Sequence, residues 1–173
     1  MNFISVIPIV VSASSLVVSF INFLSIRKER ITKQATQIVA AIDSNNKKSP
    51  DRNDKHSVPL PVVLKNFSNT AFSDVFVIPV EDYHYSFKGI NDFSYAISLK
   101  HYKYIRKLIE TEKSFWVATS GSGMSKSPDV VILFTDGNGR QWLKTPSNKL
   151  FRMKGYKEKL FKLGLPNPGY DKI

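Results

Sequence analysis

The stretch FISVIPIVVSASSLVVSFINFLSI, residues Phe3 to Ile26, contains no charged side chain. It is followed directly by Arg27, Lys28, Glu29 and Arg30. As a helix this stretch would be about 36 Å long, and about 20 apolar residues are enough to cross the hydrocarbon core of a bilayer. The sequence therefore predicts a membrane-spanning helix that carries the rest of the chain as one small domain.

Two other interpretations of this stretch are open. A cleaved signal peptide has a positively charged start and a shorter apolar core, but only Met1 and Asn2 precede the apolar run here. A lipoprotein signal is excluded because the chain has no cysteine. A buried core helix is the second alternative, although so long an uncharged run is unusual in a small domain.

Basic residues directly after the apolar run predict the orientation. Arg27, Lys28, Arg30 and Lys33 stand against the single acid Glu29, which leaves +3 on this flank. Basic flanks of membrane helices stay in the cytoplasm. We therefore expect a single-pass protein of the cell membrane, with its N-terminus outside and its C-terminal domain in the cytoplasm.

Length and charge set the domain organisation. The chain has 173 residues, a net charge of +11 and no cysteine, so disulfides and Cys-ligated metals are excluded. What remains after the apolar run is the size of one domain. The predicted organisation is a transmembrane anchor (1–26), a basic juxtamembrane linker (27–34), a β-sandwich domain (35–153) and a basic C-terminal tail (154–173).

Short β-branched and aromatic runs between turn formers predict strands. Asp136 to Gly139 is a strong turn signal between two such runs, which predicts a β-hairpin. Residues 35–42 are expected to form a strand, with continuation of the helix as the alternative, and Tyr102–Glu112 fits either a helix or a strand. The other expected strands are Val58–Asn66, Phe72–Val80, Ser114–Thr119, Val130–Phe134 and Gln141–Leu143, and the expected loops are Ser44–Ser57 and Ser120–Pro128.

Many short strands and few convincing helices indicate an all-β sandwich. Two segments also resemble small, largely uncharacterised membrane-anchored proteins of Gram-positive bacteria. VVLKNFSNTAFSDVFV (Val62–Val77) is similar to their strand–N-x-S/G-x-x–strand unit, and FTDGNGRQWLKTPSNKL (Phe134–Leu150) to their F-x-D-x-x-G-x-x-W hairpin. The resemblance implies an immunoglobulin-like antiparallel β-sandwich preceded by a single N-terminal transmembrane helix, and it implies no catalytic residues.

No catalytic, cofactor or metal site assembles in the sequence. SGSGMSKS (Ser120–Ser127) lacks two glycines of a phosphate-binding loop, and Pro128 stands where a helix should begin. Asp136 begins a run that imitates a calcium loop, but Ser147 occupies the place of the closing glutamate. The histidines His56, His84 and His101 do not have metal-ligand spacing. We therefore predict that the protein is not an enzyme.

The C-terminal part is strongly basic. Residues 140–173 hold nine Lys/Arg and two acids, so this part carries +7 of the net +11. KLFRMKGYKEKLFKL (Lys149–Leu163) fits a basic amphipathic helix on anionic lipid headgroups, or equally the end of a strand followed by a solvated face. The candidate membrane-surface residues are Arg27, Lys28, Arg30, Lys33, Arg152, Lys154, Lys157, Lys159 and Lys162.

Three functional hypotheses follow. The first is a non-catalytic interaction module with a cytoplasmic β-sandwich, whose partners are the lipid bilayer and another membrane or cytoplasmic protein. The second is a protective protein of the phage-exclusion or bacteriocin-immunity kind, and the third is an enzyme with dispersed site residues. Nucleic acid is disfavoured as a partner because no recognition module is found in the chain.

Overall fold

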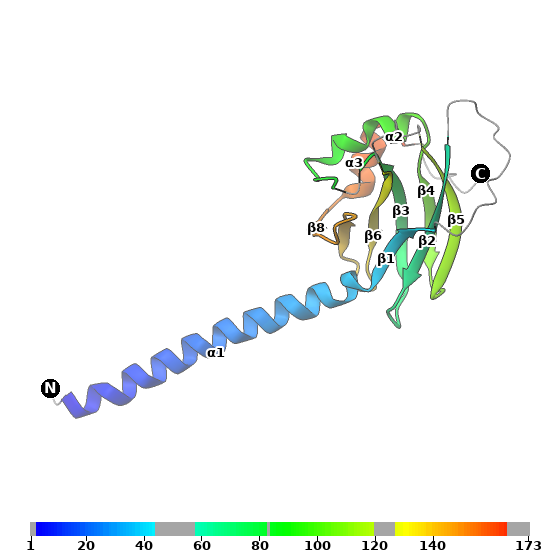
Figure 1. The fold of residues 1–173 in the computed structure, drawn as a ribbon. Coiled ribbons are helices and arrows are strands. Elements are labelled where there is room, and N and C mark those ends of the chain that lie inside the picture. Colours follow the sequence, from blue (N-terminus) through cyan, green and yellow to red (C-terminus); the bar gives the residue numbers. More distant parts are fainter. Residues whose placement is uncertain (1–2, 44–57, 83, 120–126, 166–173) are drawn as a thin grey trace. The chain divides into compact units, whose positions relative to one another are not determined.

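The computed structural model describes residues 3–43, 58–82, 84–119 and 127–165, with side chains from residue 11 onward. The predicted loop Ser44–Ser57, and all but the last two residues of Ser120–Pro128, lie outside the described residues. The chain divides into two compact units, residues 1–34 and residues 35–173 (Figure 1).

The first unit consists of most of the long helix α1 (Phe3–Thr36). All side chains of residues 11–30 are exposed. Within the described part of the chain, no helix combines the length and the apolar character needed to cross a bilayer. The prediction of a strand from Ala35 was wrong for its first three residues. Ala35 and Thr36 end α1 and Gln37 forms a turn, because the Arg, Lys, Glu, Gln and Ala residues before it are good helix formers and nothing interrupts the helix before Gln37.

The second unit is mostly β-structure. The strands predicted at Val58–Asn66 (β2) and Phe72–Val80 (β3) are confirmed with those bounds. For residues 102–112 the strand alternative holds. The remaining strands are β1 (Ile38–Ile42), β4 (Lys103–Leu108), β5 (Glu112–Thr119), β6 (Asp129–Thr135), β7 (Gln141–Lys144) and β8 (Leu150–Arg152). Short helical segments are η1 (Ile90–Phe93), α2 (Ser94–Ser98) and α3 (Tyr156–Lys162).

Eight described strands form two antiparallel sheets, consistent with the expected β-sandwich (Figure 1). One sheet has the order β1-β2-β5 and the other β4-β3-β6-β7-β8. β2 and β3 follow one another in the chain but belong to different sheets. The turn between them is held by Asn66, whose side chain is buried, accepts hydrogen bonds from Ser68 and donates one to the carbonyl of Thr70.

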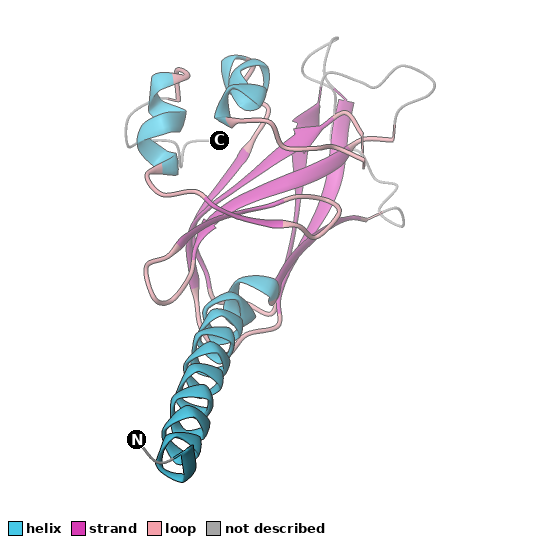
Figure 2. Cartoon of the chain, turned by 90° about the vertical axis from the view of Figure 1, so that its left-hand side faces the viewer, coloured by secondary structure: helices cyan, strands magenta, loops and turns pink. Residues whose placement is uncertain are grey.

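The five-stranded sheet is covered on both faces. Phe76, Ile78, Val131 and Leu133 pack with side chains of η1, α2 and α3 in one core, and the short helices gather beside the strands (Figure 2). Because side chains alternate along a strand, the buried residues between them face the other sheet. The apolar face of α3, Tyr156 and Leu160, is fully buried in the first core.

The predicted β6–β7 hairpin is confirmed and is organised by Asp136, which is 2% exposed. Its Oδ1 accepts the backbone N–H groups of Asn138 and Arg140, each at 2.9 Å, and its Oδ2 accepts the indole N–H of Trp142 at 2.9 Å. Gly139 has φ +73°, a conformation that costs glycine little. These contacts give a physical reason for the Asp, Gly and Trp spacing in the hairpin.

Lys144 fixes the place where α1 gives way to β1. It is 4% exposed, and its Nζ donates to the carbonyl oxygens of Thr36 at 3.0 Å and Ile38 at 2.7 Å. The last carbonyls of a helix have no partner within the helix, so the ammonium group supplies one. Burial lowers the pKa of Lys144.

Replacing Asp136 by alanine is expected to destabilise the second unit, residues 35–173, which we call the β-body, by about 2–4 kcal/mol, because a buried indole N–H and two turn N–H groups lose their acceptor. Asp136→Asn keeps one acceptor oxygen and is expected to cost less. Urea unfolding of the full-length chain in detergent micelles, followed by tryptophan fluorescence, measures the difference. The exposed Glu110→Ala is the control, and an Asp136→Ala variant as stable as that control would refute the role given to Asp136.

Candidate functional site

A cleft of about 470 Å³ opens at one end of the β-body. It lies between the last residues of β3 and β5 and the η1–α2 segment. The residues that line it are Pro79, Val80, Glu81, Asp82, Tyr85, Asp92, Tyr95, Ala96, His101 and Thr119. Carboxylates and tyrosines therefore dominate its polar lining, although the chain as a whole is strongly basic.

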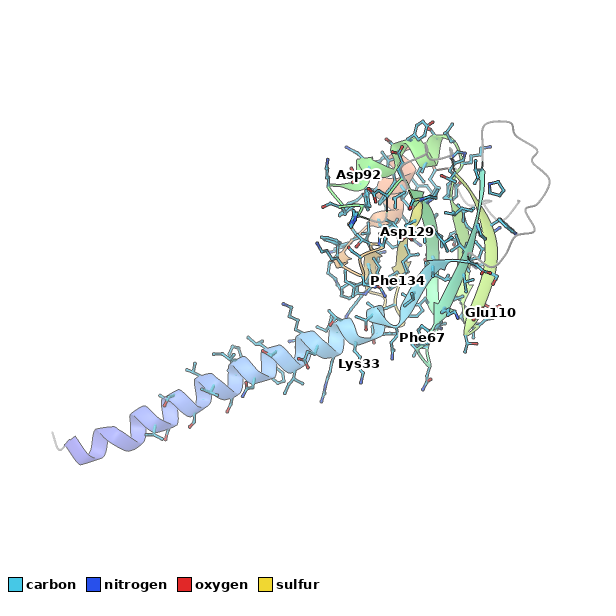
Figure 3. All side chains as sticks on the ribbon, in the orientation of Figure 1. Lys33, Phe67, Asp92, Glu110, Asp129 and Phe134 are labelled. Carbon is cyan, nitrogen blue, oxygen red and sulfur yellow. The ribbon has the colours of Figure 1, made fainter. Side chains whose placement is uncertain are left out.

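Local hydrogen bonds fix the acidic side of the cleft. The carboxylate of Asp82 accepts the backbone N–H of His84 at 2.9 Å. Asp92 accepts the hydroxyl of Tyr85 and the backbone N–H of Lys88, the latter at 3.0 Å. Asp92, labelled in Figure 3, thus holds the loop before η1 in place and also lines the cleft.

The hydrogen-bonded pair Asp92 and Tyr85 has pKa values shifted away from neutral pH. Burial acts to raise the pKa of Asp92, but the hydrogen bonds from Tyr85, Lys88 and Gly89 outweigh it, and the pKa lies below its usual value. Burial, together with the bond to Asp92 and its charge, raises the pKa of the Tyr85 phenol well above 10. At neutral pH the pair is therefore a carboxylate and a neutral phenol.

Aromatic rings and a buried histidine complete the cleft. The ring of Tyr85 lies 6.4 Å from that of Phe93, which is buried beneath it in the core. Tyr95 is 60% exposed and His101 only 8%. The backbone N–H of His101 donates to the carbonyl of Ala96 at 2.8 Å, which closes the end of α2. His84 is exposed, and His56 lies outside the described residues.

The basic residues predicted to meet a membrane surface fall into two groups. Those in α1 are all exposed. Of those in the body, Lys157 donates to Asp74 at 2.9 Å, and the guanidinium of Arg152 lies 4.7 Å from the centre of the Trp142 ring. Both are therefore engaged within the body. The exposed residues are Arg27, Lys28, Arg30 and Lys33 in α1, and Arg152, Lys154, Lys159 and Lys162 in the body.

Sequence reasoning missed the cleft. Its lining includes the end of the predicted strand Phe72–Val80, but it comes mainly from residues 81–101, to which the sequence patterns assign no helix or strand. The available signal was the density of Asp, Glu, Tyr and His between residues 81 and 101. Among the described residues no group of three or more His, Cys, Asp or Glu could hold a metal ion.

Asp129 adds a carboxyl group close to this end of the body. It pairs with Val80 in the sheet, is half-buried, and accepts the backbone N–H of Val130 at 2.7 Å. Figure 3 labels it together with Asp92. Burial raises the pKa of Asp129 above its usual value.

The Asp129→Asn variant is expected to be more stable than the parent at pH 7. A carboxyl group whose pKa is raised by folding costs stability when it is ionised, and the cost disappears as the pH falls through the folded pKa toward that of the unfolded chain. The gain is expected to be about 1 kcal/mol or less, because the group is partly solvated. Thermal unfolding at pH 7 and pH 4 checks this, with Glu110→Gln as an exposed control. A gain of equal size at both pH values would contradict it.

Comparisons of the chain with protein-family models, with curated proteins and with solved structures found no match. The resemblance to membrane-anchored proteins of Gram-positive bacteria accordingly stays a prediction.

Proposed function

We propose that the chain is a single-pass membrane-anchored interaction module without catalytic activity. In this proposal the N-terminal part of α1 lies in the bilayer and the β-body is immunoglobulin-like and cytoplasmic. The observation that carries the proposal is the exposure of the large apolar side chains of α1.

Between residues 11 and 26, exposed apolar side chains cover most of the circumference of α1, apart from a stripe of Ser12, Ser15, Ser19 and Asn22. Leu16 is 72% exposed, Phe20 60% and Phe23 58%, and a single helix cannot cover its own side chains. Soluble proteins rarely leave large contiguous apolar surfaces in water, and such surfaces usually meet lipid or another protein. A helix that is apolar all round is typical of a membrane segment.

The basic residues that follow the apolar part of α1 support the proposal that lipid surrounds this part. The described apolar side chains of α1 are followed at once by Arg27, Lys28 and Arg30, all exposed. Basic side chains at the end of a membrane helix interact favourably with the anionic inner leaflet. The body begins at Ala35, about one or two helical turns after these residues, so it would be held close to that surface.

Strand order supports the immunoglobulin-like part of the proposal. The orders β1-β2-β5 and β4-β3-β6-β7 correspond to strands A-B-E and C′-C-F-G of that fold, with β8 added at one edge.

Leu16→Arg combined with Phe20→Arg is expected to release the protein from membranes. Each arginine costs about 2.5–3.5 kcal/mol at the centre of a membrane helix. The measurement is the fraction of full-length protein that stays in the pellet after alkaline carbonate extraction of cell membranes. The parent chain is expected to remain in the pellet and the double variant to appear in the supernatant or to be degraded.

The matched control is Phe67→Arg combined with Ile109→Arg, since both side chains are 65% exposed in the body. This control is expected to extract like the parent. Extraction of the parent chain itself would refute the anchor. The orientation is tested by adding a protease to intact cells that express the parent chain. If the protease removes the β-body without cell lysis, the β-body lies outside the cell and the proposed orientation is wrong.

A further inference from the structure

We propose that the cleft between β3, β5 and the η1–α2 segment binds a lysine or arginine side chain presented by an exposed basic segment of a partner protein. This inference deepens the proposed interaction function and rests on it. It names the surface of the body that makes the contact and the chemistry of the partner.

Charge is the first argument. Glu81 and Asp82 from the end of β3 meet Asp92 from η1 at one cleft. Among the described residues, Lys88 is the cation whose charge acts on Asp92. The chain carries 25 Lys/Arg and 14 Asp/Glu, so a cleft lined by three carboxylates is opposite in sign to the protein as a whole. Such a region concentrates cationic ligands and excludes anionic ones.

Aromatic side chains are the second argument. Tyr85 and Tyr95 line the same cleft as the carboxylates. The positive end of a lysine or arginine is attracted to the face of an aromatic ring, and its aliphatic stem packs on apolar surface. Pro79, Val80 and Ala96 provide that surface. Exposed tyrosines such as Tyr95 are also enriched in protein–protein contacts.

The position of the cleft is the third argument. Ile38, two residues after α1 ends, pairs with Asn66 at one end of β2, whereas Thr119 of the cleft pairs with Val58 at the other end. The eight steps between these ends span about 26 Å. The cleft therefore lies at the opposite end of the β-body from the residues at which α1 ends.

The exposure of the lining favours a polypeptide segment over a small free cation. Glu81, Asp82, Asp92 and Tyr95 are all exposed at the rim, so a small ion there would remain largely solvated. A segment of a partner gains from several neighbouring contacts along the rim at once. A volume of about 470 Å³ accommodates a long side chain together with flanking backbone.

The test uses the full-length chain in neutral detergent micelles and isothermal titration calorimetry. The probes are a nine-residue peptide of alternating arginine and glycine, the same peptide with glutamate for arginine, and free arginine. Saturable binding of the arginine peptide alone is expected. Glu81→Gln and Tyr95→Leu are each expected to weaken it by about twofold to fivefold.

Matched controls are Glu110→Gln and Phe67→Leu, an exposed carboxylate and an exposed ring outside the cleft. They are expected to leave binding unchanged, and near-UV circular dichroism confirms that each variant is folded. The proposal is overturned if the arginine peptide does not bind, if the cleft variants behave like the controls, or if free arginine binds as tightly. Each of these results leaves the membrane extraction of the protein unaffected, so it is distinguishable from failure of the anchor.

Discussion

The apolar side chains of α1 need a cover that one helix cannot supply. Ser12, Ser15, Ser19 and Asn22 share one side of residues 11–26 at helical spacing, large apolar side chains cover the other sides, and every described side chain there is exposed. Burial of apolar surface is worth about 25 cal/mol per Å², so leaving these side chains in water is costly. In the proposed location, the hydrocarbon core of the bilayer would surround the apolar side chains of α1 and remove them from water. The proposed location and the proposed function both depend on this constraint.

The β-body is held together by polar side chains at a helix end, a hairpin turn and a strand bulge, of which Lys144 and Asp136 are buried and Asp74 is half-buried. Lys144 closes the end of α1, and Asp136 closes the hairpin. Asp74, at a bulge in β3 with φ +51°, accepts Tyr104 and Lys157 through its carboxylate and Tyr156 through its carbonyl. These contacts draw the basic α3 onto the body. The apolar side of the C-terminal segment is thereby used in the core and is not free to enter a bilayer.

Local chemistry explains which parts of the fold could be predicted. β2, β3 and the β6–β7 hairpin follow from β-branched runs bounded by Asn, Ser, Asp and Gly, so their signals lie within a few residues. The sequence prediction started the first strand too early, at Ala35. The local helix propensity of residues 27–36 is enough to continue α1 to Thr36. The C-terminal segment contains both predicted alternatives, β8 and α3, separated by Gly155 at φ +68°. The cleft could not be predicted from local sequence, because Val80 and Thr119 belong to different sheets. Strand pairing brings them to the same end of the β-body only once both sheets have formed.

The most direct test of the account is sedimentation velocity of the purified full-length chain before and after removal of detergent. If the apolar face of α1 requires lipid, the chain is expected to be homogeneous in micelles and to form large assemblies or precipitate without them. A stable 19.6 kDa monomer in detergent-free buffer would contradict the account, because the helix would then have found its cover within its own chain.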